Sequence, residues 1–232
     1  MIELRRDHQI FQTEGGWFSA RWHFSFDHYR DPGNMGWGTL RVFNDDRLIP
    51  GAIWPLHPHR DVEGLTYVVD GTFRHEDDIG TGGVLPAGSV QRMTLGSGAW
   101  HSEQNASETE PMRFIQMWIM PAERGLEPSC EQRAYTKEDR TDVLLEVISP
   151  PGGPGVVVHQ DARVFIASLS AGTAVARDVP AGFGHYVYVI GGAVELNGET
   201  MKTGDAAKIR DEARLEVRAI EPSELLTVEV AV

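Results

Sequence analysis

Turn-forming residues are the feature that most restricts the fold of this chain. The 232 residues include 25 glycines and 13 prolines, spread along the whole length. They divide the chain into short runs of apolar, β-branched and aromatic residues, and a helical repeat is weak everywhere. This distribution of turn-forming residues favours many short strands joined by turns over a few long helices. The sequence therefore predicts an all-β protein with little helix.

Three local patterns predict particular turns or caps. The alternating run GTLRVFNDDRLIPG is interrupted at 44–46, which predicts a strand, a turn and a second strand. Asp70-Gly71 lies between two runs rich in β-branched and aromatic residues, the strongest short-range signal of a hairpin. Thr136 and Asp139 have the spacing of a capping box, so a turn or two of helix is expected near them.

The segment SPPGGPG at 149–155 is the one obvious break in the chain, with three prolines and three glycines in seven residues. Beyond it, YVIGGAV at 188–194 resembles YVVDGTF at 67–73, and a glycine-containing turn follows each. This repeat predicts two related β-barrels in tandem, since closure of each sheet removes exposed edges. The predicted organisation is an N-terminal barrel at 1–135, a connecting segment at 136–155 and a C-terminal barrel at 156–232.

Two pairs of side chains have the spacing of metal ligands. His57 and His59 share one face of a strand, because successive residues point to opposite faces. Pro58 between them cannot donate to a sheet ladder, which predicts an edge or barrel-rim strand. His101 and Glu103 repeat the spacing on another strand. Three imidazoles and one carboxylate would hold one divalent ion and leave positions open for water or substrate.

The other potential ligands lack such pairing. The lone histidines are expected at the surface or hydrogen-bonded in the core: His8, His23, His28, His75, His159 and His185. Cys130 is the only cysteine, which excludes an intrachain disulfide and a cysteine cage, and it is expected to be a thiol without a role. Ordinary barrel core and a wall against planar rings are alternative roles for Trp54, Leu56, Trp100, Phe114 and Met117.

The formal net charge of −13 argues against nucleic acid as a direct partner, because binding phosphates needs clustered Lys and Arg. It also argues against an anionic membrane surface. The first residues contain no apolar signal-peptide core, and no apolar run has the length of a membrane span. The expected location is the cytoplasm.

Two long motifs resemble the cupin motifs: GAIWPLHPHRDVEGLTYVVDG and PAGSVQRMTLGSGAWHSEQN. Over residues 17–135 their details, together with FIQMWIMP and CEQRAY, resemble the pirin family. The resemblance implies two tandem cupin barrels of the double-stranded β-helix or jelly-roll type, with metal only in the N-terminal one. It also implies that the carboxylate ligand is Glu103. The general cupin position falls on Gly64, and Glu63, one residue away, would face the opposite side of the strand.

Bacterial pirins resemble quercetinases, which use dioxygen to open the central ring of a flavonol and release carbon monoxide. The resemblance therefore implies a flavonol-like substrate, dioxygen and Fe(II), whereas the donor types alone leave Ni, Cu, Co, Mn and Zn open. Glu103 is then the natural base for the 3-hydroxyl proton. Two alternatives remain: a metal- or redox-sensing regulator that binds a transcription factor or other protein, and an enzyme whose true substrate is not a flavonol.

Overall fold

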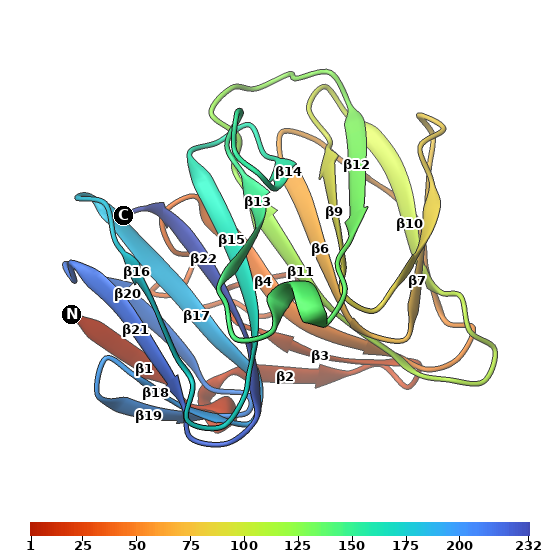
Figure 1. Ribbon diagram of the computed structural model, residues 1–232. Helices are drawn as coiled ribbons and strands as arrows, with labels where there is room; N and C mark the ends of the chain where they lie inside the picture. The colour runs from red at the N-terminus through yellow and green to blue at the C-terminus, as the bar shows by residue number, and fades with distance from the viewer.

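The computed structural model describes residues 1–232 and is almost entirely β-structure. Two barrels lie side by side, and each consists of a seven-stranded sheet and a four-stranded sheet (Figure 1). Helical structure is confined to two short 3-10 turns, η1 (Asp7–Gln9) and η2 (Glu138–Arg140). The predicted fold class, two tandem cupin barrels, is confirmed. No helix has the length and apolar character needed to cross a membrane.

The N-terminal barrel carries the predicted ligand strands on its smaller sheet. The larger sheet contains, in spatial order, β12 (Ser129–Ala134), β9 (Ser89–Thr94), β6 (Glu63–Asp70), β11 (Met112–Ile119), β4 (Leu40–Leu48), β3 (Phe18–Trp22) and β2 (Phe11–Glu14). The smaller sheet contains β5 (Ile53–His59), β10 (Ala99–Asn105), β7 (Thr72–Asp77) and β8 (Gly83–Pro86). The strand with two histidines, β5, therefore lies at a sheet edge, as Pro58 predicts.

The C-terminal barrel also takes in the first strand of the chain. Its larger sheet contains, in spatial order, β1 (Ile2–Arg5), β20 (Ala206–Arg210), β17 (Phe183–Gly191), β22 (Ser223–Ala231), β15 (Ala162–Leu169), β13 (Leu145–Ser149) and β14 (Val156–Val157). Its smaller sheet contains β16 (Ala174–Asp178), β21 (Arg214–Ala219), β18 (Ala193–Leu196) and β19 (Glu199–Lys202). Aliphatic side chains such as Val187, Leu196 and Leu225 fill the interior of this barrel.

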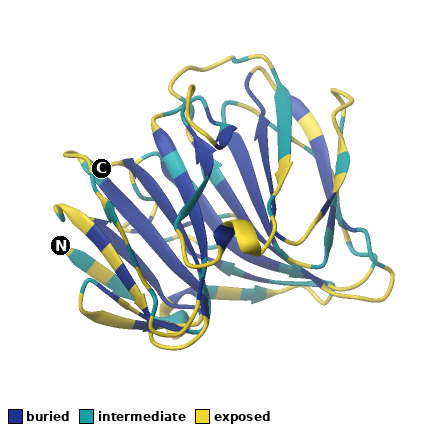
Figure 2. Cartoon of the chain, in the orientation of Figure 1, coloured by how far each residue is buried: buried dark blue, intermediate teal, exposed yellow.

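The two large sheets pack face to face, and the buried strands run through the middle of the molecule (Figure 2). Successive side chains of β11 alternate between the core that joins the barrels and the interior of the N-terminal barrel. Ile115, Met117 and Ile119 join the core of 24 buried residues that includes side chains from both barrels. Phe114 and Trp118, on the other face of the same strand, line a cavity inside the N-terminal barrel.

A buried ion pair of the N-terminal barrel, Asp45 and Arg113, is hydrogen-bonded to the second barrel within this core. The Asp45 carboxylate accepts hydrogen bonds from Arg113 Nε and Nη2, at 2.9 and 2.7 Å, and from the Tyr188 hydroxyl at 2.5 Å. The turn predicted at 44–46 is therefore wrong, because β4 runs unbroken from Leu40 to Leu48. Buried polar residues are tolerated in this strand because the second barrel supplies partners for them.

The hairpin predicted at Asp70-Gly71 is also wrong, although both flanking strands exist. Here β6 pairs with β9 and β11 in the large sheet, whereas β7 pairs with β8 and β10 in the small one. Gly71 has φ +79°, and a Cβ there would lie 2.6 Å from the Pro111 carbonyl oxygen. Gly192, with φ +86°, forms the same corner between β17 and β18. The repeated sequence pattern thus marks the corners at which each barrel's chain changes sheet.

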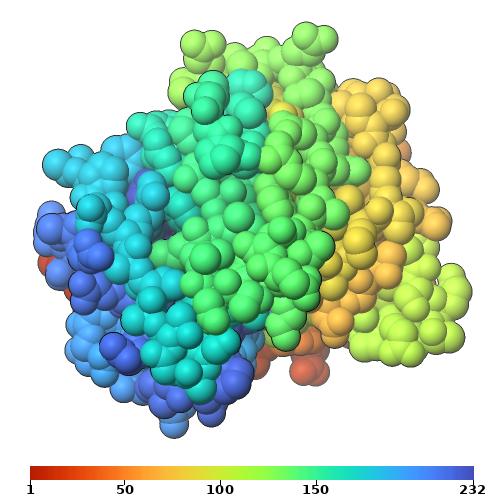
Figure 3. Space-filling model, in the orientation of Figure 1, coloured from red at the N-terminus to blue at the C-terminus, as the bar shows by residue number.

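The segment between the barrels contains the predicted capping box. The Asp139 amide donates to Thr136 Oγ1 at 3.2 Å, and the Thr136 amide donates to the Asp139 carboxylate at 2.7 Å. Thr136 precedes η2, a single turn, and Asp139 lies within it. The chain then forms β13 before residues 150–155 turn back toward β14. This part of the chain crosses the face between the barrels (green in Figure 3).

Replacing Tyr188 by Phe tests the hydrogen bond that links the buried Asp45 carboxylate to the second barrel. The substitution removes one hydrogen bond to a buried carboxylate and should lower the free energy of unfolding by about 1.5–3 kcal/mol in urea titrations. In the control Tyr135→Phe, the lost partner is the exposed Arg133 at 3.5 Å, and the change should stay within about 0.5 kcal/mol. Equal effects in the two variants would contradict this account of the interface.

Candidate metal centre

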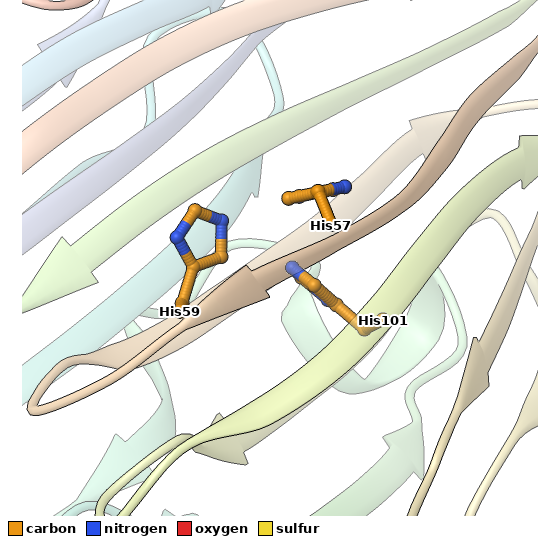
Figure 4. Close-up of side chains that lie close together, drawn as sticks. All are labelled: His57, His59 and His101. Atoms are coloured by element: carbon orange, nitrogen blue, oxygen red, sulfur yellow. The ribbon is translucent and has the colours of Figure 1, made fainter.

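Strand pairing brings the three predicted histidines together. His57 is the register partner of His101 across β5 and β10, and His59 lies two residues further along β5 on the same face. Figure 4 shows His57 and His59 rising from β5 and His101 from β10, with their rings around a common space. The ring centroids lie 4.5 Å apart for His57 and His101, 4.8 Å for His57 and His59, and 5.2 Å for His59 and His101.

The nitrogen atoms of this triad are arranged as ligands. One ring nitrogen from each histidine lies within 4.8 Å of the other two. His57 Nδ1 is 2.7 Å from the Pro55 carbonyl oxygen, which can only accept. Nδ1 must therefore carry the proton, and the lone pair of Nε2 is available for an ion.

Burial keeps two of these rings neutral. His101 is only 2% exposed, and neither of its nitrogens has a hydrogen-bond partner. Desolvation, and then the neighbouring imidazoles, lower the pKa of His101 to about 2. Desolvation and His57 lower the pKa of His59 to about 4. Buried nitrogens without a partner, as in His101, are costly, and the three rings together offer the imidazole donors that suit a divalent transition metal ion.

Glu103 lies in the same cavity as the triad but outside the group of donor atoms within 4.8 Å of one another. A β-bulge between His101 and Glu103 shifts the register, so that Glu103 is opposite Trp54 on β5. Its Oε1 atom is buried without a partner. Burial raises the pKa of Glu103 to about 7, although a hydrogen bond from Gln116 opposes the shift. Its position suits a carboxylate that accepts protons near neutral pH or binds an ion beside the triad.

Glu63 lies away from the triad, as strand parity predicts. Its carboxylate accepts hydrogen bonds from Thr94 Oγ1 at 2.8 Å and from the His159 amide at 2.7 Å, and it lies 2.8 Å from His159 Nδ1. Since β14 and the residues after it belong to the second barrel, Glu63 ties the two barrels together. Glu63 is therefore a buried acid that stabilises the structure through its hydrogen bonds.

A cavity of about 540 Å³ opens beside the triad. Its apolar wall comes from β3, β5, β11 and the residues on either side of β3, and consists of Trp17, Phe18, Trp22, Phe26, Trp54, Leu56, Phe114 and Trp118. Its polar lining consists of Asp27, His28, Asn44, Asp46, His57, His59, Glu103 and Gln116. The cavity therefore combines an aromatic wall with several titratable groups.

Of the five wall residues suggested by the sequence, Trp54, Leu56 and Phe114 line the cavity. The other two do not. Trp100 is 45% exposed on the outer face of β10, and Met117 belongs to the core between the barrels. The sequence reasoning missed most of the wall, which comes from the aromatic stretch around β3. The cluster of aromatic residues is visible in the sequence, since WHFSFDHY follows a Trp-Phe pair. The local sequence does not indicate which face of the sheet those rings occupy.

The fold and the site define a two-barrel cupin protein with a histidine-rich candidate metal site in the N-terminal barrel. The family model described as Pirin matches residues 4–119, and that described as Quercetinase C-terminal cupin domain matches residues 146–230. The chain belongs to the pirin family. The two matches fall on the two barrels, and the resemblance noted over residues 17–135 is confirmed.

Individual relatives match along the whole chain. The chain is 38% identical over 233 residues to a pirin-like protein of Caulobacter vibrioides and covers 100% of both sequences. It is 38% identical over 228 residues to the quercetin 2,3-dioxygenase of Escherichia coli K12, over 97% of each. The crystal structure of the bacterial pirin YhhW from Escherichia coli in complex with nickel(II) superposes with a TM-score of 0.92. It shares 36% identity, covering 100% of this chain and 99% of that chain.

The two buried glutamates of the N-terminal barrel offer a matched test of the fourth ligand. We expect Glu103→Gln to reduce the metal retained per folded chain after dialysis against a weak chelator, because an amide oxygen carries no charge for the ion. Glu63→Gln removes a charged contact to His159 and should lower stability, yet retain the metal. Elemental analysis of both variants measures the difference. Equal retention would argue against Glu103 as a ligand.

Proposed function

We propose that this protein is a metal-dependent dioxygenase that cleaves flavonols such as quercetin, with one divalent ion held by His57, His59, His101 and Glu103. The observation that carries the proposal is the cavity itself: three imidazoles converge, with one carboxylate in the same cavity and a wall of aromatic rings around them. The quercetin 2,3-dioxygenase of Escherichia coli, at 38% identity, supports the same reaction.

The donor set suits several first-row ions. Imidazoles and a carboxylate bind Fe, Ni, Cu, Co, Mn or Zn, with selection by geometry and availability. Fe(II) is the ion implied by the pirin resemblance, and nickel(II) is bound in the YhhW complex. When bound, such an ion acts as a Lewis acid that lowers the pKa of a coordinated hydroxyl group.

The proton of the flavonol 3-hydroxyl has a nearby acceptor. Burial raises the pKa of Glu103 to about 7, and a bound cation would lower it, so Glu103 would be ionised and able to accept a proton at neutral pH. Asp46 faces it in the same cavity, and burial together with the Glu103 charge raises the pKa of Asp46 well above its usual value. These two carboxyl groups can therefore accept the substrate proton and retain it in the cavity. The ionised flavonol is the electron-rich form that reacts with dioxygen.

Aromatic side chains form a wall of the cavity against which a planar substrate could pack. Trp54 packs edge-on against Trp17, with ring centroids 4.7 Å apart, and against Phe18 at 4.9 Å. Trp118 packs against the His59 ring at 4.6 Å. These contacts fix the rings before a ligand arrives, which lowers the entropic cost of binding. A volume of about 540 Å³ is in the usual range for small-molecule sites. The wall would also exclude water from the reacting ring.

Steady-state oxygen consumption with quercetin tests the reaction. We expect iron- or nickel-loaded wild-type protein to turn over and His57→Ala to lose more than about 100-fold in kcat/KM, since even outer partners of metal ligands contribute 10–100-fold. His8→Ala, at an exposed histidine, is the control and should behave as wild type. Metal-loaded protein that binds quercetin without turnover would refute the dioxygenase proposal and favour the regulator.

Two tryptophans on opposite faces of the small sheet test the aromatic wall. Trp54→Ala removes a cavity ring and should raise KM for quercetin about tenfold, the equivalent of roughly 1.4 kcal/mol, with a smaller effect on kcat. Trp100→Ala changes an exposed ring on the neighbouring strand and should leave both constants unchanged. A flavonol that binds elsewhere would show no difference between the two variants.

A further inference from the structure

His75 is the histidine whose surroundings contradict the expectation for lone histidines. It is 0% exposed, and neither Nδ1 nor Nε2 has a hydrogen-bond partner. It lies on β7, where Asp77 is two residues further along and therefore on the same face. A buried imidazole with two free nitrogens beside a carboxylate is an unusual arrangement, because buried polar groups are almost always paired.

The third member of this group comes from the opposite sheet. Cys130 lies on β12, the edge strand of the large sheet, and its Sγ atom is within 4.8 Å of donor atoms of both His75 and Asp77. His75 Nδ1 is 3.7 Å from the Asp77 carboxylate. That separation is too long for a hydrogen bond but close to the spacing of roughly 3.3–3.8 Å between two ligands of one tetrahedral ion.

We propose that His75, Asp77 and Cys130 form a second metal site, one that takes a thiophilic divalent ion of the zinc type. One imidazole nitrogen, one carboxylate oxygen and one thiolate sulfur make a donor set that suits zinc, and water would complete four-coordination. The site is separate from the His57, His59 and His101 triad and does not depend on the dioxygenase proposal.

The neighbouring residues leave both His75 nitrogens without a partner and hold Asp77 in place beside them. Asp77 is anchored at the β7–β8 turn by hydrogen bonds from Thr81 Oγ1 at 2.6 Å and from the Thr81 amide at 2.9 Å. Burial raises the pKa of the Asp77 carboxyl, but these hydrogen bonds outweigh it and lower the pKa overall, so Asp77 is ionised. Burial raises the pKa of Cys130 to about 11, so an arriving ion must displace the thiol proton to solvent. Cys130 is only half-buried, which gives the ion a route in.

The second site would share a wall with the first. His75 contacts His101, with ring centroids 5.6 Å apart and an interplanar angle of 73°. In the register of β10 and β7, His101 is opposite Asp77 and Glu103 is opposite His75. An ion that holds His75 and Asp77 would therefore fix the side chains directly beside two residues of the first site.

Cobalt(II) titration tests the proposal, because thiolate coordination produces an intense near-ultraviolet charge-transfer band and Cys130 is the only thiol. We expect wild-type protein to bind two ions per chain and show the band. Cys130→Ser should bind one ion without the band, and His57→Ala/His59→Ala should bind one ion and keep it. One ion per chain in wild type, with no thiolate band in it or in the double variant, would overturn the second site.

Thiol reactivity gives a second readout that does not depend on the Cys130 variant. Zinc(II) should slow the reaction of Cys130 with a disulfide reagent at least tenfold in the His57→Ala/His59→Ala protein, and a chelator should restore the rate. Adding His75→Gln should abolish most of this protection, with circular dichroism as the check on folding. A rate that zinc does not change would contradict the proposal.

Discussion

The structure depends on a sheet that is buried on both faces. Strand β11 alternates between side chains that line the cavity, such as Phe114, and side chains that pack against the second barrel, such as Ile115. Without the second barrel, the outer face of this sheet would expose a large apolar surface to water. The interior of the C-terminal barrel is filled with aliphatic side chains. Its physical role is to cover the outer face of the large sheet in the barrel that holds the candidate metal site.

That arrangement explains why the site lies on the other sheet. The large sheet is immobilised by packing on both sides, and it supplies a rigid aromatic wall. The small sheet has an edge, β5, at which Pro58 interrupts donation to a ladder and His57 and His59 face inward beside His101. The buried His101 nitrogens have no hydrogen-bond partner, which is unfavourable, and an ion would relieve that cost.

The sequence predicts the features that strand alternation controls. The shared face of His57 and His59, the edge position of β5 and the exclusion of Glu63 all follow from local spacing. Features that depend on distant partners were predicted wrongly. Asp45 suggests a turn locally, but it is buried because Arg113 and Tyr188, 68 and 143 residues away, donate to it.

The same limit explains the wrong hairpin and the missed cluster. A glycine corner between two strand-like runs has the same local signal whether the runs pair or enter different sheets. The approach of His75 to Cys130 joins opposite sheets, and no spacing along the chain could indicate it. The sequence shows that the pattern repeats in both halves of the chain, but it does not show that each copy is a corner between two sheets.

The central claim is that three imidazoles and one carboxylate converge on one ion. Anomalous X-ray diffraction from crystals of Cys130→Ser protein loaded with one equivalent of nickel(II) tests it most directly. The account predicts a single strong peak about 2.0–2.2 Å from one nitrogen each of His57, His59 and His101, with a Glu103 oxygen at similar distance. A peak elsewhere, or the three rings turned toward solvent with no peak between them, would contradict it.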